Sequence, residues 1–274
     1  MLKFEIAFGL RPEFLSNTME WLAPIAFVFV VVIFAVAGLL FVRRRVNHGE
    51  LSKHNDVGGV IFSIVGTLYA VILAFVVIIV WEALGTADDR AAQEAGVLGD
   101  LMRDAGFFPD PQRTELQKEL REYAQAVIDE EWPAMVNSGS SQHVWEILDR
   151  TFESFSRITP NTQREANIHA EMLRRLNDLS DHRRLRLLSA DNKVPPLMWA
   201  MLIVGGFITV GFSYFLGVER RRSHVLMTAA LAGMIGLTLY LILALDHPFA
   251  GTIRVEPDGF RLVLDKVGPV NYSK

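Results

Sequence analysis

Cysteine is absent from the chain, and its absence excludes a disulfide framework, a thiolate metal site and a cysteine nucleophile. The sequence also lacks a glycine-rich phosphate-binding loop, a nucleophile elbow and a paired-histidine zinc motif. The formal net charge is only −4 over 274 residues, which gives no sign of a nucleic-acid partner. We therefore expect neither an enzyme nor a protein that binds a cofactor, a metal ion or nucleic acid.

Charged residues are missing from four long stretches as well. These charge-free stretches cover residues 21–42, 57–81, 194–218 and 225–245. A bilayer core of ~30 Å is crossed by about 20 helical residues, so each stretch is long enough to span a membrane. Together with a hydrophobic content of 51%, the stretches predict an all-α membrane protein with four transmembrane helices in a lipid bilayer.

The four spans group into two hairpins around one insert. Hairpin 1 covers residues 21–81 and hairpin 2 covers residues 194–245, with tails at 1–20 and 246–274. The insert of residues 82–193 carries apolar residues at helical spacing, so we expect a helical extramembrane domain between the second and third spans. No stop signal ends the second span, which predicts one helix of about 70 Å from residue 58 to about residue 104.

Basic residues mark both short links within the hairpins. Arginines 43–45 end the first span, and Glu219 followed by arginines 220–222 joins the third span to the fourth. Short loops rich in Lys and Arg usually stay in the cytoplasm, which predicts that the insert lies on the non-cytoplasmic side. Arg183, Arg184, Arg186 and Lys193 lie close to the third span and favour the opposite orientation.

Helix signals and charge are distributed unevenly along the insert. Asp110-Pro111 is typical of a helix start, and Thr162 with Glu165 fits a capping box. An apolar stripe then runs through Ile168, Met172, Leu176 and Leu179. Residues 82–131 hold 13 acidic and 5 basic residues, whereas residues 164–193 hold 5 acidic and 7 basic residues. We expect the two halves to pair, with a modest energy for each exposed pair.

Three groups of polar residues are candidate ligand sites. Glu165 with His169, and Asp178 with His182, have the i, i+4 spacing of metal ligands, but such pairs arise readily by chance on a polar helix. Asp246 and His247 follow the fourth span at the membrane interface. They are either a polar helix terminus or a site of selectivity or pH sensing, since histidine titrates near neutrality.

Several segments resemble a known family. The segments Phe62-Ser63-Ile64-Val65-Gly66 and Leu73-Ala74-Phe75 resemble the second transmembrane helix of bacterial bestrophins. The whole chain is similar to a bestrophin-like family of uncharacterised bacterial membrane proteins. The matching segments are Gly66-Thr67-Leu68-Tyr69-Ala70, Trp81-Glu82, Glu131-Trp132-Pro133, Pro195-Pro196, Glu219-Arg220-Arg221-Arg222 and Asp246-His247-Pro248-Phe249.

This resemblance implies a homo-oligomeric ion channel in the bacterial inner membrane, with a pore lined by the second transmembrane helix. By position, the resemblance places an apolar neck at Thr67, Val71 and Phe75, which would gate inorganic ions by dewetting. Ser63 would add a hydroxyl to the same pore. Glu82 lies beyond the interfacial Trp81, where a ring of glutamates from several copies would attract cations.

Other readings of the same residues stay open. The small and hydroxyl side chains of the second span also suit helix packing in lipid. Residues 76–80 stay apolar where bacterial bestrophins become polar, so the shared pattern would then reflect packing and not a pore. In that case the protein is a non-conducting membrane scaffold or partner subunit whose helical domain binds another protein.

Overall fold

The structure is a computed structural model that describes residues 18–46 and 55–266. Within these residues every regular element is a helix and no strand occurs. The chain divides into two compact units. The first unit consists of Met1–Ile78 and Pro195–Leu243, and the second unit consists of Ile79–Val194 and Ala244–Lys274.

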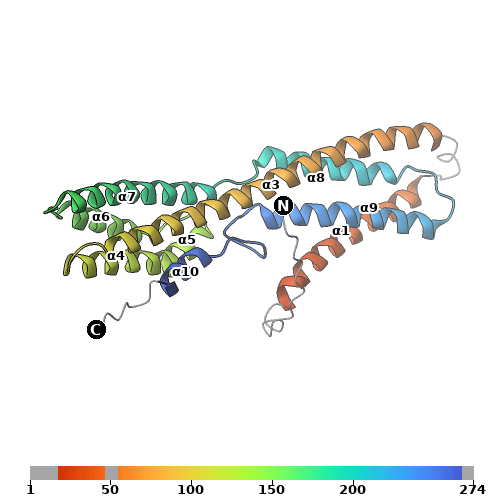
Figure 1. Ribbon diagram of the computed structural model, residues 1–274. Coiled ribbons are helices and arrows are strands. Elements are labelled where there is room, and N and C mark those ends of the chain that lie inside the picture. Colours follow the sequence, from red (N-terminus) through yellow and green to blue (C-terminus); the bar gives the residue numbers. More distant parts are fainter. Residues whose placement is uncertain (1–17, 47–54, 267–274) are drawn as a thin grey trace. The chain divides into compact units, whose positions relative to one another are not determined.

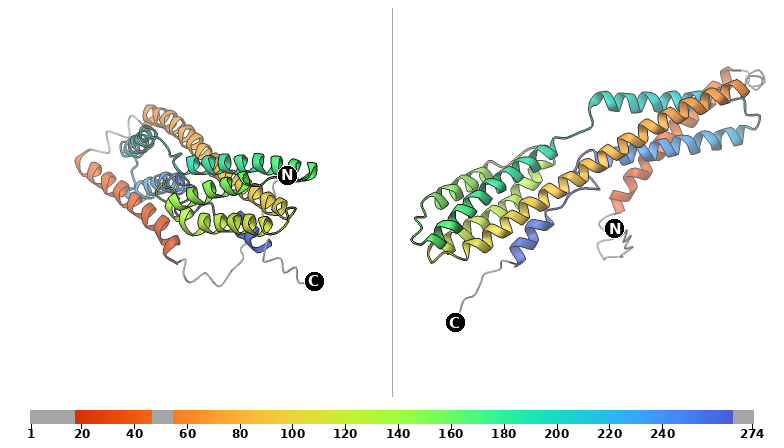
Figure 2. Two further views of the ribbon diagram at one scale, coloured as in Figure 1. Left: turned by 90° about the vertical axis from the view of Figure 1, so that its left-hand side faces the viewer. Right: turned by 45° about the horizontal axis from the view of Figure 1, so that its top comes forward.

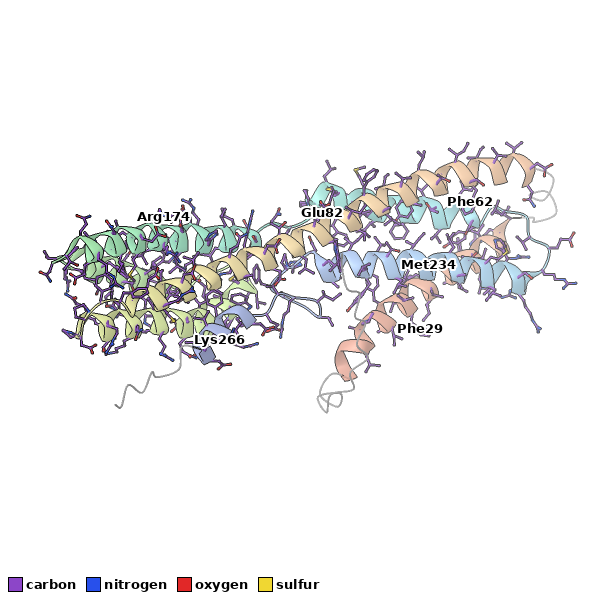
Figure 3. The ribbon with its side chains drawn as sticks, in the orientation of Figure 1. Phe29, Phe62, Glu82, Arg174, Met234 and Lys266 are labelled. Atoms are coloured by element: carbon purple, nitrogen blue, oxygen red, sulfur yellow. The ribbon has the colours of Figure 1, made fainter. Side chains whose placement is uncertain are left out.

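The first unit is built from apolar helices. They are α1 (Thr18–Arg45), the beginning of α3 (Asn55–Ala105), α8 (Pro196–Ser213) and most of α9 (Arg221–Leu245). Each is long and apolar enough to cross a membrane, which confirms the four predicted spanning helices. Large apolar side chains project outward around these helices, as Phe29 and Met234 illustrate (Figure 3).

Close helix contacts in the first unit depend on small residues. Tyr69 of α3 is buried, and its hydroxyl donates a hydrogen bond of 2.8 Å to the carbonyl oxygen of Leu202 on α8. The Tyr69 ring leaves no room for a side chain at Gly205, where a Cβ would lie 2.5 Å from the ring. Gly236 of α9 lies close to Val31 of α1 in a similar way, since a Cβ there would be 3.3 Å from that side chain. Without a hydrophobic effect between helices in lipid, such close packing holds the unit together.

Helix α8 is shorter than the charge-free stretch that contains it. It ends at Ser213, because the amides of Tyr214 and Phe215 bond carbonyl oxygens three residues back and tighten the chain into a turn. Gly217 then bonds the side chain of Asn55, which accepts from the Gly217 amide at 2.7 Å and donates to its carbonyl at 2.9 Å. This amide pair fixes the α8–α9 link to the first turn of α3.

Helix α3 is continuous from Asn55 to Ala105, as the missing stop signal predicts. Its 51 residues correspond to about 75 Å at a rise of about 1.5 Å per residue. A Cβ added at Gly59, Gly66, Gly85 or Gly96 would meet no atom within 4 Å. These glycines therefore sit on open faces of the helix and do not mark breaks in it.

The second unit is a helical bundle around one apolar core. It contains the end of α3, α4 (Gln112–Ala126), a π-helical turn η3 (Val127–Glu131), α5 (Trp132–Met135), α6 (Gln142–Ser156), α7 (Gln163–Ala190) and α10 (Asp258–Lys266). Helices α4 and α7 run beside the end of α3, and α6 packs against both α4 and α7 (Figures 1 and 2). The buried apolar side chains include Leu98 of α3, Leu120 of α4, Leu148 of α6 and Leu176 of α7.

Local signals define some helix starts better than others. Thr162 caps α7 as predicted, because its hydroxyl accepts from the amide of Glu165 at 3.1 Å and the Glu165 carboxylate accepts from Asn161 at 2.8 Å. Asp110 does not cap α4, which begins at Gln112. Its carboxylate accepts instead from the hydroxyl of Thr114 at 2.8 Å.

Candidate functional site

One face of α3 stays uncovered within the first unit, opposite the face that packs. At about 100° per residue, Tyr69, Leu73 and Val76 lie roughly 140–200° around the helix from Val71, and all three are buried. Val71 is 47% exposed and Phe75 is 62% exposed. Ser63 and Thr67 are exposed on the same side, and the Ser63 hydroxyl bonds the Gly59 carbonyl at 2.9 Å. Four of the five predicted pore residues, all except Glu82, therefore share one open face of the first unit.

Glu82 and the pair Asp246–His247 belong to the second unit. Glu82 is exposed on α3 (Figure 3). At about 100° per residue it keeps the angular position of Val71 and Phe75. Asp246 is buried, and its carboxylate accepts a hydrogen bond of 2.6 Å from the Val194 amide. Nδ1 of His247 lies 4.0 Å from Oδ2 of Asp246. Asp246 thus has a structural bond that the sequence did not reveal.

Four buried charged residues form a network in the second unit. Glu94 of α3, Glu131 of η3, and Arg183 and Arg186 of α7 are all 0% exposed. Arg186 donates to Glu94 at 2.6 and 3.0 Å and to Glu131 at 2.7 Å. Arg183 donates to Glu131 at 2.5 and 3.1 Å. The acidic and basic halves of the insert therefore pair as predicted, but these pairs are buried and not exposed.

Aromatic side chains enclose this charge network. The Tyr123 hydroxyl donates to Glu94 at 2.7 Å. The Arg183 guanidinium lies over the Trp145 ring at 4.0 Å, and that of Arg186 lies over the Trp132 ring at 5.1 Å. Such cation–π contacts strengthen when water is excluded. Arg183 Nη1 is buried without a hydrogen-bond partner, so the Trp145 ring supplies part of its stabilisation.

The π-helical turn brings Glu131 into this network. Pro133 has no amide hydrogen, so it cannot continue the regular helical bonds. The amide of Trp132 instead bonds the carbonyl of Val127, five residues back, and the turn widens. The Trp132 indole donates to the Val255 carbonyl at 3.1 Å, and its ring packs against Phe249 and Phe260. Two of the family-like segments, Glu131-Trp132-Pro133 and Asp246-His247-Pro248-Phe249, therefore meet in one core.

The charge network makes the second unit sensitive to acid. Burial raises the pKa of Glu131, but Arg183 and Arg186 outweigh burial and hold it below its usual value. A carboxylate with a depressed folded-state pKa contributes stability above its unfolded pKa of about 4.3 and loses it as the pH falls through the folded value. We therefore expect thermal stability to drop below about pH 4, measured by tryptophan fluorescence in detergent, and Glu131→Gln to flatten this drop.

Glu119 provides the matched control for this pH dependence. Burial raises the pKa of Glu119 despite a hydrogen bond of 2.8 Å from Ser154 and the nearby Arg150. A raised carboxyl pKa has the opposite effect on stability, because the folded state then binds the proton more tightly than the unfolded state. The ionised form of Glu119 therefore lowers the stability of the fold at neutral pH. Glu119→Gln should leave neutral-pH stability unchanged or raise it. An acid drop of wild-type steepness in Glu131→Gln would contradict our assignment.

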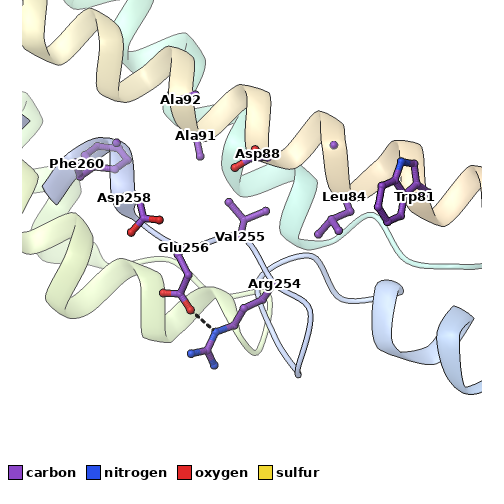
Figure 4. Close-up of a pocket in the computed structure, with 12 residues that line it drawn as sticks. Trp81, Leu84, Asp88, Ala91, Ala92, Arg254, Val255, Glu256, Asp258 and Phe260 are labelled. Atoms are coloured by element: carbon purple, nitrogen blue, oxygen red, sulfur yellow. Dashed lines mark hydrogen bonds and ion pairs between the residues drawn. The ribbon is translucent and has the colours of Figure 1, made fainter. Parts of the chain in front are cut away.

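An open cleft of about 450 Å³ lies in the second unit between α3 and the segment that leads into α10 (Figure 4). Its wall combines apolar side chains such as Trp81 and Phe260 with Asp88, Glu256 and Asp258. Arg254 compensates part of this negative charge, because its Nε donates to Glu256 at 2.7 Å. The cleft contains none of the predicted site residues.

Neither of the two histidine pairs with metal-ligand spacing is joined by a third His, Asp or Glu ligand in the described part of the chain. His169 bonds the Phe155 carbonyl oxygen at 2.8 Å through Nε2. Over residues 18–46 and 55–266, no three His, Asp or Glu side chains converge on one point. Nδ1 of His182 is buried without a hydrogen-bond partner among the described residues.

Comparisons with known proteins place this fold in a family. A family model described as the Bestrophin-like domain matches residues 29–260. Two solved structures of variants of a bacterial bestrophin homolog from Klebsiella pneumoniae have TM-scores of 0.65 and 0.64 at 14% and 12% identity. Both alignments cover 88% of this chain, and they cover 99% and 97% of the solved chains.

A further structure, described as a membrane protein, has a TM-score of 0.62 at 15% identity over 90% of this chain and 99% of its own. At these identities the structural likeness shows the fold alone. No curated protein matches the chain by sequence. The family model covers most of the chain and agrees with the segments noted in the sequence, so the protein belongs to the bestrophin-like family.

Proposed function

We propose that several copies of this protein assemble into an ion channel in the bacterial inner membrane, with the open face of α3 lining the pore. The observation that carries this proposal is the asymmetry of α3. One side packs through Tyr69 and Leu73, whereas the opposite side presents Thr67, Val71 and Phe75 with no partner in the same unit. The bestrophin-like family and fold support the same reading.

The chemistry of this face suits a narrow apolar neck. Thr67, Val71 and Phe75 follow one another at about one helical turn, or ~5.4 Å. A ring of such side chains from several copies would let water and ions pass only when the ring widens. The uncharged spans lack the ionisable groups at depth that pumps and coupled transporters use, so passive conduction is the better match.

We also propose an orientation of the chain in the membrane and a position for the entrance of the pore. The basic residues of both short links favour a cytoplasmic position for them, and residues 82–193 would then lie on the non-cytoplasmic side. Glu82 would form a ring of carboxylates where α3 leaves the membrane. His247 and Asp246 would lie at the interface of the same side of the membrane.

Native mass spectrometry and ion flux in liposomes test this proposal together. We expect an oligomer that conducts, and we expect Glu82→Gln to lower the permeability of cations relative to anions several-fold, because a ring of negative charge is removed. Asp181→Asn is the control, since Asp181 is an exposed acid of α7 away from α3. A strict monomer would refute the pore. An oligomer that is sealed under all conditions would favour the non-conducting scaffold.

A further inference from the structure

Three helices of the first unit leave an apolar groove of about 570 Å³ between them. Its walls come from α1, α8 and α9, and its rim includes Phe34 and Phe207, each 74% exposed. This volume lies within the range of about 300–1,000 Å³ that is typical of small-molecule pockets. Nearly every lining side chain is hydrocarbon, so the occupant must present hydrocarbon as well.

Three glycines line the groove, and they differ in the space around them. Gly38, Gly206 and Gly211 line it. A Cβ at Gly38 would lie 2.8 Å from the Tyr214 hydroxyl, so α1 and α8 meet closely there. A Cβ at Gly211 would meet nothing within 4 Å. A larger side chain at Gly211 would therefore enter the groove without a clash at its first carbon.

The groove runs toward the basic end of the first unit. It extends from Val30 to Gly38 on α1, which is about 12 Å along the helix axis. Five residues beyond Gly38, the Arg43 guanidinium donates to the Val218 carbonyl at 3.2 Å and lies 3.0 Å from Nδ1 of His224. These bonds hold the end of α1 against the α8–α9 link, next to Tyr214 at the groove's end.

Positive charge is concentrated at this end of the unit. Arginines 43–45 lie at the end of α1 and arginines 220–222 at the start of α9, and the acids nearest to them in the described sequence are Glu219 and Asp56. Arg44 and arginines 220–222 are exposed, and within the described chain none of them makes an ion pair. Side chains of the α8–α9 link project outward (Figure 3). A phosphate group is the anion that matches such arginines best.

We propose that this groove binds one acyl chain of an anionic phospholipid, whose phosphate is held by Arg44 and arginines 220–222. The hydrocarbon would lie between Phe34 and Phe207, and the glycerol would pass the Tyr214 hydroxyl at the interface. Basic residues at a membrane surface attract anionic headgroups at about 1 kcal/mol each. The groove adds a fixed place for the chain. This inference goes beyond the proposed function, because it requires neither a pore nor conduction.

The test measures lipid retained by the full-length protein in detergent, by native mass spectrometry, during titration with dioleoyl phosphatidylglycerol or dioleoyl phosphatidylcholine. We expect phosphatidylglycerol to bind at least about tenfold more tightly. Replacing arginines 220–222 with glutamine should weaken phosphatidylglycerol about tenfold or more and leave phosphatidylcholine within about twofold. A matched triple variant, Arg164→Gln, Arg174→Gln and Arg184→Gln, removes the same charge from the second unit and should change nothing.

Gly211→Leu tests the chain in the groove, with Gly59→Leu as its control. Both glycines have open space at the Cβ, but only Gly211 lines the groove. We expect Gly211→Leu to lower phosphatidylglycerol retention about as much as the arginine variant does, and Gly59→Leu to keep it. Equal binding of the two lipids would overturn the proposal. It would also fail if Gly211→Leu retained lipid normally but altered the oligomer, because a second copy would then fill the groove.

Discussion

Arg186→Met should destabilise the second unit more than any exposed charge change, by about 3–5 kcal/mol. Arg186 is fully buried and bridges Glu94 and Glu131. Without it, Glu94 keeps only the Tyr123 hydroxyl, whereas Glu131 keeps Arg183. Removing one partner of a buried pair leaves an uncompensated charge in a low-dielectric environment. We expect the melting temperature in detergent, followed by tryptophan fluorescence, to fall by roughly 10 °C.

Two variants separate this explanation from a general loss of packing. Arg174→Met removes an exposed arginine that pairs with Glu171 on the same helix, and it should cost about 1 kcal/mol or less. The double variant Glu94→Leu with Arg186→Met removes the stranded carboxylate and keeps the pair of Glu131 and Arg183. It should recover most of the lost stability, because apolar replacement of a whole buried pair is often neutral. Equal melting temperatures for Arg186→Met and Arg174→Met would refute the network's importance.

The helix face on which these charged residues lie can be predicted from the sequence, but the partner of each charge cannot. Arg183 and Arg186 continue the stripe of Met172, Leu176 and Leu179 at helical spacing, so they belong to the core face of α7. Glu94 likewise lies on the same face of α3 as Leu98 and Leu101. Charges on an apolar stripe predict burial with a partner. Which acid meets which arginine depends on the π-helical turn at Glu131, which periodicity does not predict.

The spanning helices could be predicted because a run without charge is a direct consequence of the lipid environment. The end of α8 could not, because Tyr214 to Val218 remain apolar while their backbone turns. The role of Asp246 was missed for a similar reason. Its partner, the amide of Val194, lies 52 residues away in sequence. Only the fold brings the two segments together.

The proposed pore face of α3 could be predicted from the sequence only in part. Periodicity alone predicts which residues of α3 share a side, and the structure leaves that side open. In a single chain, however, a face that meets lipid and a face that meets an aqueous pore are both exposed. Whether the face meets lipid or a pore depends on the neighbouring copies. A test therefore requires a measurement that a change in helix packing would not alter in the same direction.

A gain of ion flux is such a measurement, because misfolding does not produce it. Under the proposed function, Phe75→Ser places a hydroxyl in the apolar neck and lowers the cost of wetting it. We expect ion flux in liposomes to rise by on the order of tenfold, which corresponds to about 1.4 kcal/mol of barrier. Val71→Ser, on the same face, should act in the same direction.

Met234→Ser is the matched control for the neck. Met234 of α9 is 65% exposed, close to the 62% of Phe75, and it lies in the same unit on another helix. The change also replaces a large apolar side chain with a hydroxyl, so it should alter packing in lipid without altering flux. If Phe75→Ser and Met234→Ser both kept wild-type flux in an intact oligomer, α3 would face lipid or a neighbouring helix at Phe75, and the pore would have to be sought elsewhere.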